Sequence, residues 1–243
     1  MQNKIEKLLE YINESNNIVF FGGAGVSTES GIPDFRSKDG LYNQHDVQFD
    51  KYNPEYLLSR DCLYNNPKVF YEFYRQKMDA RNIEPNITHR VLAKLEEVGK
   101  LKAVVTQNID GLHQAAGSKV VYELHGSVLR NYCMNCGKFY DGEYVRHAEG
   151  VPKCEKCGGT IKPDVVLYEE GLDDDVITGA VNSIMRADTL IVGGTSLVVY
   201  PAAGLIDYYR GNKLILINKS ATPRDSVADY IYQGSLSDIF SKL

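Results

Sequence analysis

Four of the five cysteines stand in two pairs with the spacing of a metal site. Cys133 and Cys136 form one C-x2-C pair, Cys154 and Cys157 form the other, and seventeen residues separate the pairs. Two tight turns at this spacing can present four thiolates to one tetrahedral zinc ion. Four thiolates leave no open position for water, so the spacing predicts a structural zinc and not a catalytic one.

Glycines accompany these pairs. Gly137 follows the first, and Gly158 and Gly159 follow the second, where the chain has to turn back with positive φ. Cys62 stands alone and is interpreted as a small core residue and not as a nucleophile.

A loop of small residues follows the first apolar run and could approach a pyrophosphate. Gly23, Ala24 and Gly25 belong to it, but Thr28 stands where a dinucleotide fingerprint has its third glycine. Pro33 then prevents the long helix that follows this loop in dehydrogenases. A strand end that could read a ribose carries Asn218 instead of an acidic residue. The pattern predicts a site for NAD that is not arranged for hydride transfer.

Polar side chains follow two further apolar runs. One run ends in Gln107-Asn108-Ile109-Asp110, and the next ends in His125-Gly126. The unperturbed pKa of histidine is about 6.5, so His125 is a natural general base. His113 could equally be a capping or core histidine, and His45, His89 and His147 have no comparable context.

The elements that must position these residues are short strands alternating with helices. Apolar runs with little polar alternation cover residues 18–21, 103–106, 120–124, 189–192 and 214–217, and an amphipathic helix is expected over residues 88–98. This order predicts an α/β fold with a doubly wound, parallel, Rossmann-like sheet. Ligands of such sheets bind at the carboxyl ends of the strands.

Two segments interrupt the alternation. We expect a Rossmann-like domain built from residues 1–36, 83–126 and 164–243, with a helical and loop insertion over residues 37–82 and a zinc module over residues 127–163. Both insertions are expected to pack on the sheet.

Composition excludes several classes of protein. The net charge of −5 and the pI of about 5.6 give no general attraction to a phosphate backbone, so nucleic acid is not expected to bind directly. An acidic surface suits lysine-rich peptides, although this charge is also ordinary for solubility. The N-terminus lacks the apolar core of a signal peptide, and no apolar run is long enough to span a membrane, so a cytoplasmic protein is expected. The oligomeric state is left open.

Taken in order, the motifs resemble the sirtuins, the Sir2 family of NAD-dependent protein deacylases. The resemblance is carried by residues 23–27 (GAGVS), 31–36 (GIPDFR), 106–113 (TQNIDGLH) and 125–126 (HG), the two cysteine pairs, residues 162–166 (KPDVV), 194–197 (GTSL) and 217–218 (IN). It covers nearly the whole chain.

The resemblance implies a protein-lysine deacetylase that moves the acetyl group to ADP-ribose and releases nicotinamide and O-acetyl-ADP-ribose. The acetyl-lysine oxygen would attack the ribose carbon, and His125, the base, would then take a proton from a ribose hydroxyl. Asn108 and Asp110 would be catalytic, and Val166 and Tyr168 would line the acyl-lysine tunnel. The implied NAD contacts are Gly23, Ala24, Gly25, Thr28, Phe35, Arg36, Gln107, Asn108, Ile109, Asp110, His125, Gly194, Thr195, Ser196, Asn218 and Lys219, with Gly234 and Ser235 near the adenine.

The chain departs from the family in one place. Tyr168-Glu169-Glu170 stands where relatives usually read Phe-Gly-Glu, so three effects of Glu169 stay open: it narrows the peptide site, it favours basic flanking residues, or it is a neutral surface substitution. Residues 69–77 contain no Tyr-x-x-Arg pair to grip an acidic acyl group, which favours acetyl and other uncharged acyl groups. Three alternatives stay open: a mono-ADP-ribosyltransferase, a non-catalytic NAD-sensing scaffold, and a zinc-ribbon nucleic-acid binder, the last disfavoured by charge.

Overall fold

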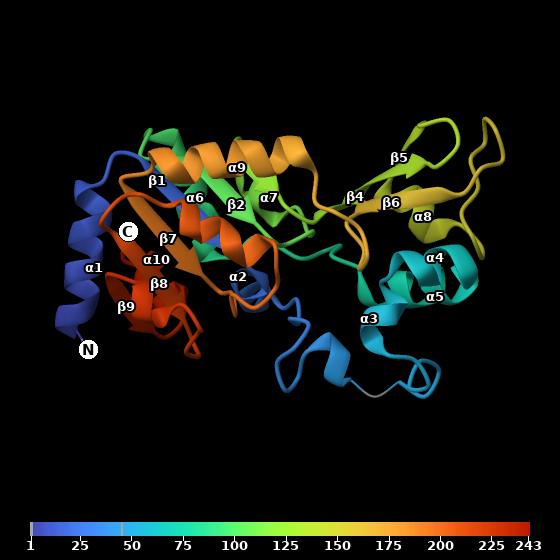
Figure 1. Cartoon of the computed structure of the whole chain (residues 1–243), viewed down its shortest axis with the longest axis horizontal. Coiled ribbons are helices and arrows are strands. Elements are labelled where there is room, and N and C mark those ends of the chain that lie inside the picture. Colours follow the sequence, from blue (N-terminus) through green and yellow to red (C-terminus); the bar gives the residue numbers. More distant parts are fainter. Residues whose placement is uncertain (1, 45) are drawn as a thin grey trace.

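The computed structural model describes residues 2–44 and 46–243 and consists of two lobes (Figure 1). The larger lobe is built on a six-stranded parallel sheet with the order β3-β2-β1-β7-β8-β9. Its strands are β1 (Ile18–Gly22), β2 (Leu101–Thr106), β3 (Val121–Glu123), β7 (Thr189–Gly193), β8 (Leu214–Asn218) and β9 (Tyr230–Gln233). The chain places β2 and β3 on one side of β1 and the later strands β7, β8 and β9 on the other side, so the topological switch point lies between β1 and β7. Doubly wound sheets bind their ligands at such switch points.

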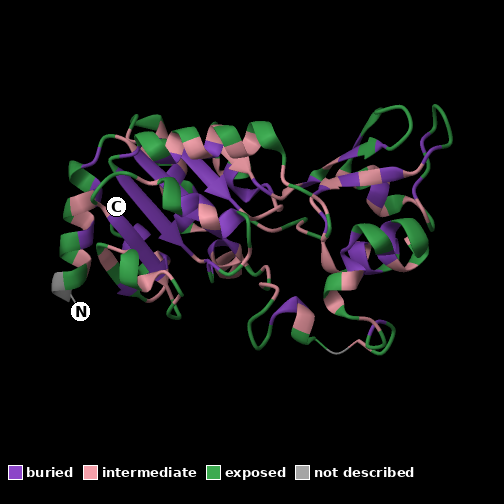
Figure 2. Cartoon of the chain, in the orientation of Figure 1, coloured by how far each residue is buried: buried purple, intermediate pink, exposed green. Residues whose placement is uncertain are grey.

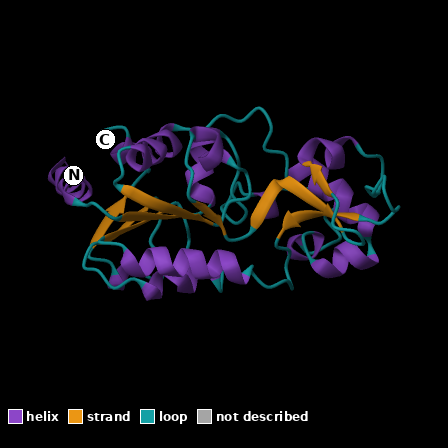
Figure 3. Ribbon diagram, turned by 90° about the horizontal axis from the view of Figure 1, so that it is seen from above, coloured by secondary structure: helices purple, strands orange, loops and turns teal. Residues whose placement is uncertain are grey.

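Helices cover both faces of this sheet, as the continuous apolar runs predict. Along β1, Ile18 and Phe20 pack with α1 (Gln2–Glu14) and α6 (Ile87–Glu97), whereas Val19 and Phe21 pack with α9 (Asp174–Arg186) on the opposite face. All five residues of β1 are buried (Figure 2). The helices of this lobe are α1 (Gln2–Glu14), α2 (Ala24–Ser27), α6 (Ile87–Glu97), α7 (Leu112–Ala116), α9 (Asp174–Arg186) and α10 (Ser237–Phe240). The layered arrangement is seen edge-on in Figure 3.

The smaller lobe combines the two segments that interrupt the alternation. Its elements are helices α3 (Pro54–Leu57), α4 (Arg60–Asn65), α5 (Pro67–Lys77) and α8 (Gly142–His147) and an antiparallel sheet of β4 (Gly126–Cys133), β5 (Phe139–Asp141) and β6 (Ile161–Val165), in the order β5-β4-β6. Short 3-10 turns at Thr28–Ser30, Leu41–Asn43, Ala202–Tyr208 and Asp225–Val227 complete the described chain.

The expectation that both insertions pack on the sheet is wrong. They share one core, in which Phe70 and Tyr71 of α5 meet Ile161 of β6, and they lie together beyond the carboxyl ends of the parallel strands (Figure 1). The physical reason is burial, because neither segment has enough apolar side chains to form a core of its own. The Tyr71 hydroxyl donates to the Ile161 carbonyl and ties the two segments together.

Within the part of the chain that the structure describes, no helix is long and apolar enough to cross a membrane.

Candidate active site and zinc site

A cavity of about 820 Å³ lies at the carboxyl ends of the parallel strands, and both lobes contribute to its walls. Its volume is in the range of sites that hold a cofactor. The loops after β1, β2, β7 and β8 line it from the large lobe, and residues 165–170 line it beside the small lobe. The cavity therefore lies where the parallel-sheet prediction places a ligand.

The glycine-rich loop after β1 packs directly against the loop after β7. The Gly25 N–H donates to the Gly194 carbonyl at 2.7 Å, and a Cβ built on Gly25 would lie 2.7 Å from Gly194 Cα. Glycine is needed here for this close approach of two backbones as well as for access to a ligand. Helix α2 has only four residues and ends well before Pro33, as predicted. The Thr28 hydroxyl donates to the Gly25 carbonyl at 3.0 Å.

Behind the wall of the cavity, one buried hydroxyl connects the loops after β1 and β2. The Ser27 hydroxyl donates to Asp110 Oδ2 at 2.6 Å and accepts from Asn108 Nδ2 at 3.0 Å. Burial raises the pKa of Asp110, while the bond from Ser27 acts in the opposite direction. Asn108 and Asp110 were predicted as site residues. Ser27 was not singled out, although its position in the GAGVS motif was the signal for it.

His125 lies half-buried at the edge of the same cavity. Its Nδ1 is 2.9 Å from the Gln107 carbonyl, and since a carbonyl can only accept, Nδ1 carries the proton and Nε2 has the free lone pair. Burial lowers the pKa of His125 and the charge of Arg36 acts in the same direction, whereas the bond to the Gln107 carbonyl acts against them. The imidazole is thus held in the neutral tautomer that a general base requires.

Gly126 explains why a glycine follows this histidine. Its φ is +76°, and a Cβ there would lie 1.9 Å from the Asp164 carbonyl oxygen of β6. Any larger residue would push β4 away from β6 and displace His125, whose carbonyl accepts from the Val166 N–H at 2.9 Å.

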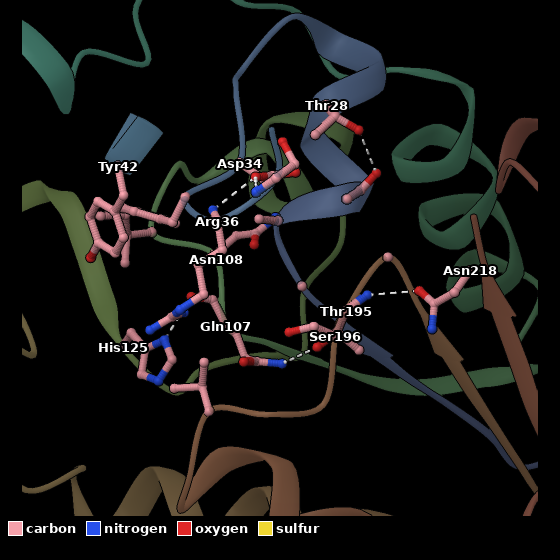
Figure 4. Close-up of a pocket in the computed structure, with 18 of the residues that line it drawn as sticks. Thr28, Asp34, Arg36, Tyr42, Gln107, Asn108, His125, Thr195, Ser196 and Asn218 are labelled. Atoms are coloured by element: carbon pink, nitrogen blue, oxygen red, sulfur yellow. Dashed lines mark hydrogen bonds between the residues drawn. The ribbon is translucent and has the colours of Figure 1, made fainter. Parts of the chain in front are cut away.

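The other end of the cavity is a chain of hydrogen bonds between strand ends. Gln107 Nε2 donates to Thr195 Oγ1 at 3.0 Å, and the Thr195 N–H donates to Asn218 Oδ1 at 2.9 Å. The Nδ2 of Asn218 is buried and has no partner. An unpaired buried donor facing a cavity fits the hydroxyl-rich ribose of a dinucleotide. Figure 4 shows His125 and Asn108 at one side of the cavity and Asn218 at the other.

The remaining predicted cofactor and substrate residues also meet in this cavity. The wall of the cavity is lined by Gly23, Ala24, Phe35, Arg36, Ile109, Ser196, Lys219, Gly234, Ser235, Val166 and Tyr168. Asp110 is the exception among the predicted residues, because it does not line the wall itself and is linked to the lining residue Asn108 through Ser27. Tyr42 lines the cavity and was missed, since it lies in an insertion without a motif to mark it.

Glu169 has an unusual backbone conformation. Its φ is +74°, the left-handed region that a glycine adopts without strain. Its Oε2 accepts from the Asp61 N–H at 3.0 Å, at the start of α4. The glutamate therefore keeps the turn of a glycine and adds a contact to the small lobe.

The four paired cysteines form the metal site that their spacing predicts. Their sulfur atoms all lie within 4.8 Å of one another, at the tip of the small lobe and away from the cavity. This arrangement fits a tetrahedral zinc ion. Gly137 and Gly158 have the expected positive φ, of +68° and +72°, whereas Gly159 does not. The Tyr140 hydroxyl donates to Cys154 Sγ at 3.1 Å and was not predicted.

Two other predictions concern buried side chains outside the site. Cys62 is fully buried, and burial raises its pKa to about 11, as expected for an inert core thiol. His113 is a core residue whose ring lies 4.7 Å from that of His89, and burial lowers their pKa values to about 3 and about 4. His89 completes the N-terminal capping box of α6 with Asn86. His45 lies outside the described residues.

Comparisons with known proteins place this geometry in a family. The Sir2 family profile matches residues 23–201. An NAD-dependent protein deacetylase of Clostridium perfringens is 61% identical over 245 residues, which span 100% of this chain and 99% of that protein. One of Clostridium acetobutylicum is 62% identical over 237 residues, spanning 97% and 96%.

Solved structures of Sir2 proteins are also similar to this chain. A complex of Sir2 with a p53 peptide and NAD+ superimposes with a TM-score of 0.85 at 40% identity and covers 98% of this chain and 96% of that one. A Sir2 structure bound to acetylated peptide gives a TM-score of 0.86 at 39% identity, with the same coverage.

Proposed function

Because the chain belongs to the Sir2 family, we propose that it is an NAD-dependent protein-lysine deacetylase that produces nicotinamide and O-acetyl-ADP-ribose. The observation that carries the proposal is the oriented imidazole of His125 in a cavity whose wall also includes Asn108, with Ser27 and Asp110 bonded behind it. A histidine base alone would also fit a hydrolase, so the Ser27–Asn108–Asp110 cluster is needed to favour an NAD-consuming enzyme.

We assign the residues of the cavity as follows. His125 takes a proton from a ribose hydroxyl at Nε2, and its Nδ1 bond to the Gln107 carbonyl keeps Nε2 directed into the cavity. Asn108 and Asp110 hold the nicotinamide end, with Ser27 orienting both side chains. NAD, when bound, supplies an electrophilic ribose carbon from which nicotinamide leaves. Phe35 keeps water from that end of the cavity.

The adenosine half is assigned to the opposite end. Thr195, Ser196, Asn218 and Lys219 lie on the loops after β7 and β8, and Gly234 and Ser235 follow β9. The free Nδ2 of Asn218 is the donor we assign to the adenosine ribose. Val166 and Tyr168 form the wall beside which an acetyl-lysine side chain approaches His125.

The deciding experiment is mass spectrometry of an acetyl-lysine peptide incubated with the protein, with and without NAD. We expect loss of the acetyl mass only with NAD, together with O-acetyl-ADP-ribose. His125→Ala should lower the rate by about 10²–10⁴-fold, the usual contribution of a positioned base. His147→Ala is the matched control, because this histidine is exposed on α8 of the small lobe.

Each outcome has a distinct meaning. Retention of full turnover by His125→Ala would refute the assignment of the base. A peptide that gains the mass of ADP-ribose would show a transferase instead. An intact acetyl-lysine peptide in the presence of NAD would refute deacetylation as the activity of this protein.

A further inference from the structure

The loop that follows the glycine-rich segment is folded on itself by local hydrogen bonds. We call residues 34–43 the cofactor loop, since Phe35 and Arg36 belong to it. Asp34 Oδ1 accepts from the Arg36 and Ser37 N–H groups, at 3.0 and 2.7 Å. The Asp34 carbonyl accepts from Leu41, and the Phe35 carbonyl accepts from Tyr42. These bonds give the loop a shape but do not fix its position in the cavity.

Two bonds from this loop meet on a single oxygen of the opposite wall. Tyr168 Oη lies 2.9 Å from Tyr42 Oη and accepts from Arg36 Nη2 at 3.0 Å. The tyrosine itself is held by its backbone, because its N–H donates to the Leu58 carbonyl and its carbonyl accepts from Arg60, both at 3.0 Å. A residue of the substrate wall whose backbone is bonded on both sides thus holds the loop of the cofactor side.

The other anchor of Arg36 is weaker. Glu55 Oε1 lies 3.4 Å from Arg36 Nη2, and both side chains are about half exposed. Exposed ion pairs of this kind contribute little, whereas the shorter bond from the guanidinium to Tyr168 Oη joins the partly buried bond between the Tyr168 and Tyr42 hydroxyls. Burial and the bond to Tyr168 raise the pKa of Tyr42, so its hydroxyl stays neutral and available for hydrogen bonding. A phenylalanine at position 168 would have no oxygen to offer either partner.

We propose that the Tyr168 hydroxyl is a positioning group that orders the cofactor loop, through Arg36 and Tyr42, before NAD binds. The inference rests on the proposed function, since it concerns the same NAD site. An ordered loop loses less conformational freedom when the cofactor arrives, so affinity for NAD is higher than it would be for a free loop. The ring of Tyr168 lines the acyl-lysine side, and its hydroxyl acts on the cofactor side.

The test compares Tyr168→Phe with the unmodified protein by calorimetric titration with NAD in the absence of peptide. The substitution keeps the ring and removes only the oxygen. We expect the Kd for NAD to rise about 3- to 30-fold, less than the full loss of one charge-assisted and one neutral hydrogen bond would give, because the bond from Arg36 is exposed. Amide hydrogen exchange over residues 34–43 should become faster, a readout that does not depend on turnover.

Two further variants separate this network from a simple contact. Tyr42→Phe should reproduce part of the rise in the Kd for NAD. The double variant should bind NAD no more weakly than Tyr168→Phe alone, because both changes remove the same hydrogen bond. Tyr132→Phe, on an exposed ring of β4, is the matched control and should leave the Kd for NAD unchanged.

Several results would overturn the inference. An unchanged Kd and unchanged exchange in Tyr168→Phe would show that the loop is ordered without the hydroxyl. Additive effects of the two tyrosine variants would show two independent contacts. These results leave deacetylation by the unmodified protein untouched, whereas its failure to deacetylate any peptide would refute the proposed function and not the anchoring of the loop.

Discussion

The protonation of one imidazole sets the acid limit of the proposed reaction. Burial and Arg36 lower the pKa of His125 from its ordinary value of 6.5. The neutral form, which is the base, therefore persists at pH values where an exposed histidine is already protonated. When kcat/KM for an acetyl-lysine peptide is measured from pH 5 to 8, we expect the midpoint of its acid limb to lie below pH 6.5. An acid limb above pH 6.5 would mean that His125 is not the titrating base.

A second residue-scale prediction concerns Glu169. Alanine at φ +74° keeps the backbone strain and loses the bond to the Asp61 N–H, whereas glycine loses the bond but relieves the strain. We expect Glu169→Gly to be more stable than Glu169→Ala by about 1 kcal/mol, the reverse of the usual order of these residues. Chemical unfolding of the two variants measures the difference. An alanine variant as stable as the glycine variant would show that the strain is relieved elsewhere.

At the scale of elements, the parallel sheet followed from sequence because both of its faces are covered. The runs of β1 and β7 are buried throughout and almost entirely apolar, so each could be recognised from its own sequence. Strand β9 was missed because it lies at the sheet edge, where three of its four residues are at least partly exposed. The shared core of the small lobe was missed because no periodicity in one segment indicates its partner in another.

The zinc site belongs to this scale, since it holds strands together. Removing the metal should loosen β4, β5 and β6 and leave the parallel sheet intact. We expect Cys154→Ala to lose bound zinc and to show faster amide exchange in the small lobe, with β1 and β7 still protected. Cys62→Ala should keep one zinc ion per chain, because this thiol lies outside the cluster. Loss of protection in both lobes at once would show that the sheet also depends on the metal.

At the scale of the whole molecule, an arginine joins the two lobes between the end of β3 and β6. Arg130 of β4 lies 2.7 Å from Glu123 at the end of β3 and 2.8 Å from Asp164 of β6. Glu123 has only 8% of its side chain exposed, so its charge needs this partner.

We expect Arg130→Met to lower the free energy of unfolding by about 2–4 kcal/mol and to reduce kcat/KM through displacement of His125. Arg130→Lys should recover only part of the lost stability and part of the lost kcat/KM, because one ammonium group cannot bond Glu123 and Asp164 from separate nitrogen atoms as the guanidinium does. Urea unfolding and steady-state kinetics are the measurements. A methionine variant with unchanged kcat/KM would show that the lobes keep their relative position without the ion pairs.

The candidate site was predicted most completely where a motif follows a buried strand, as at Gln107, Asn108 and His125. Sequence did not reveal the bonds that cross between motifs, such as those of Ser27 with Asp110 and of Tyr168 with Tyr42. Such bonds join residues distant along the chain, and their geometry depends on how the two lobes meet.

The position of β1 at the centre of the sheet also has a consequence for synthesis on the ribosome. Its Ile18 pairs with Leu101 of β2 on one side and with Thr189 of β7 on the other. The strand therefore leaves the ribosome early, and its edge toward β7 stays unpaired until most of the chain has been synthesised. Long-range parallel pairing of this kind is slow, and an unpaired apolar strand can aggregate. The nascent chain should therefore need protection of Ile18–Gly22 until β7 has been translated.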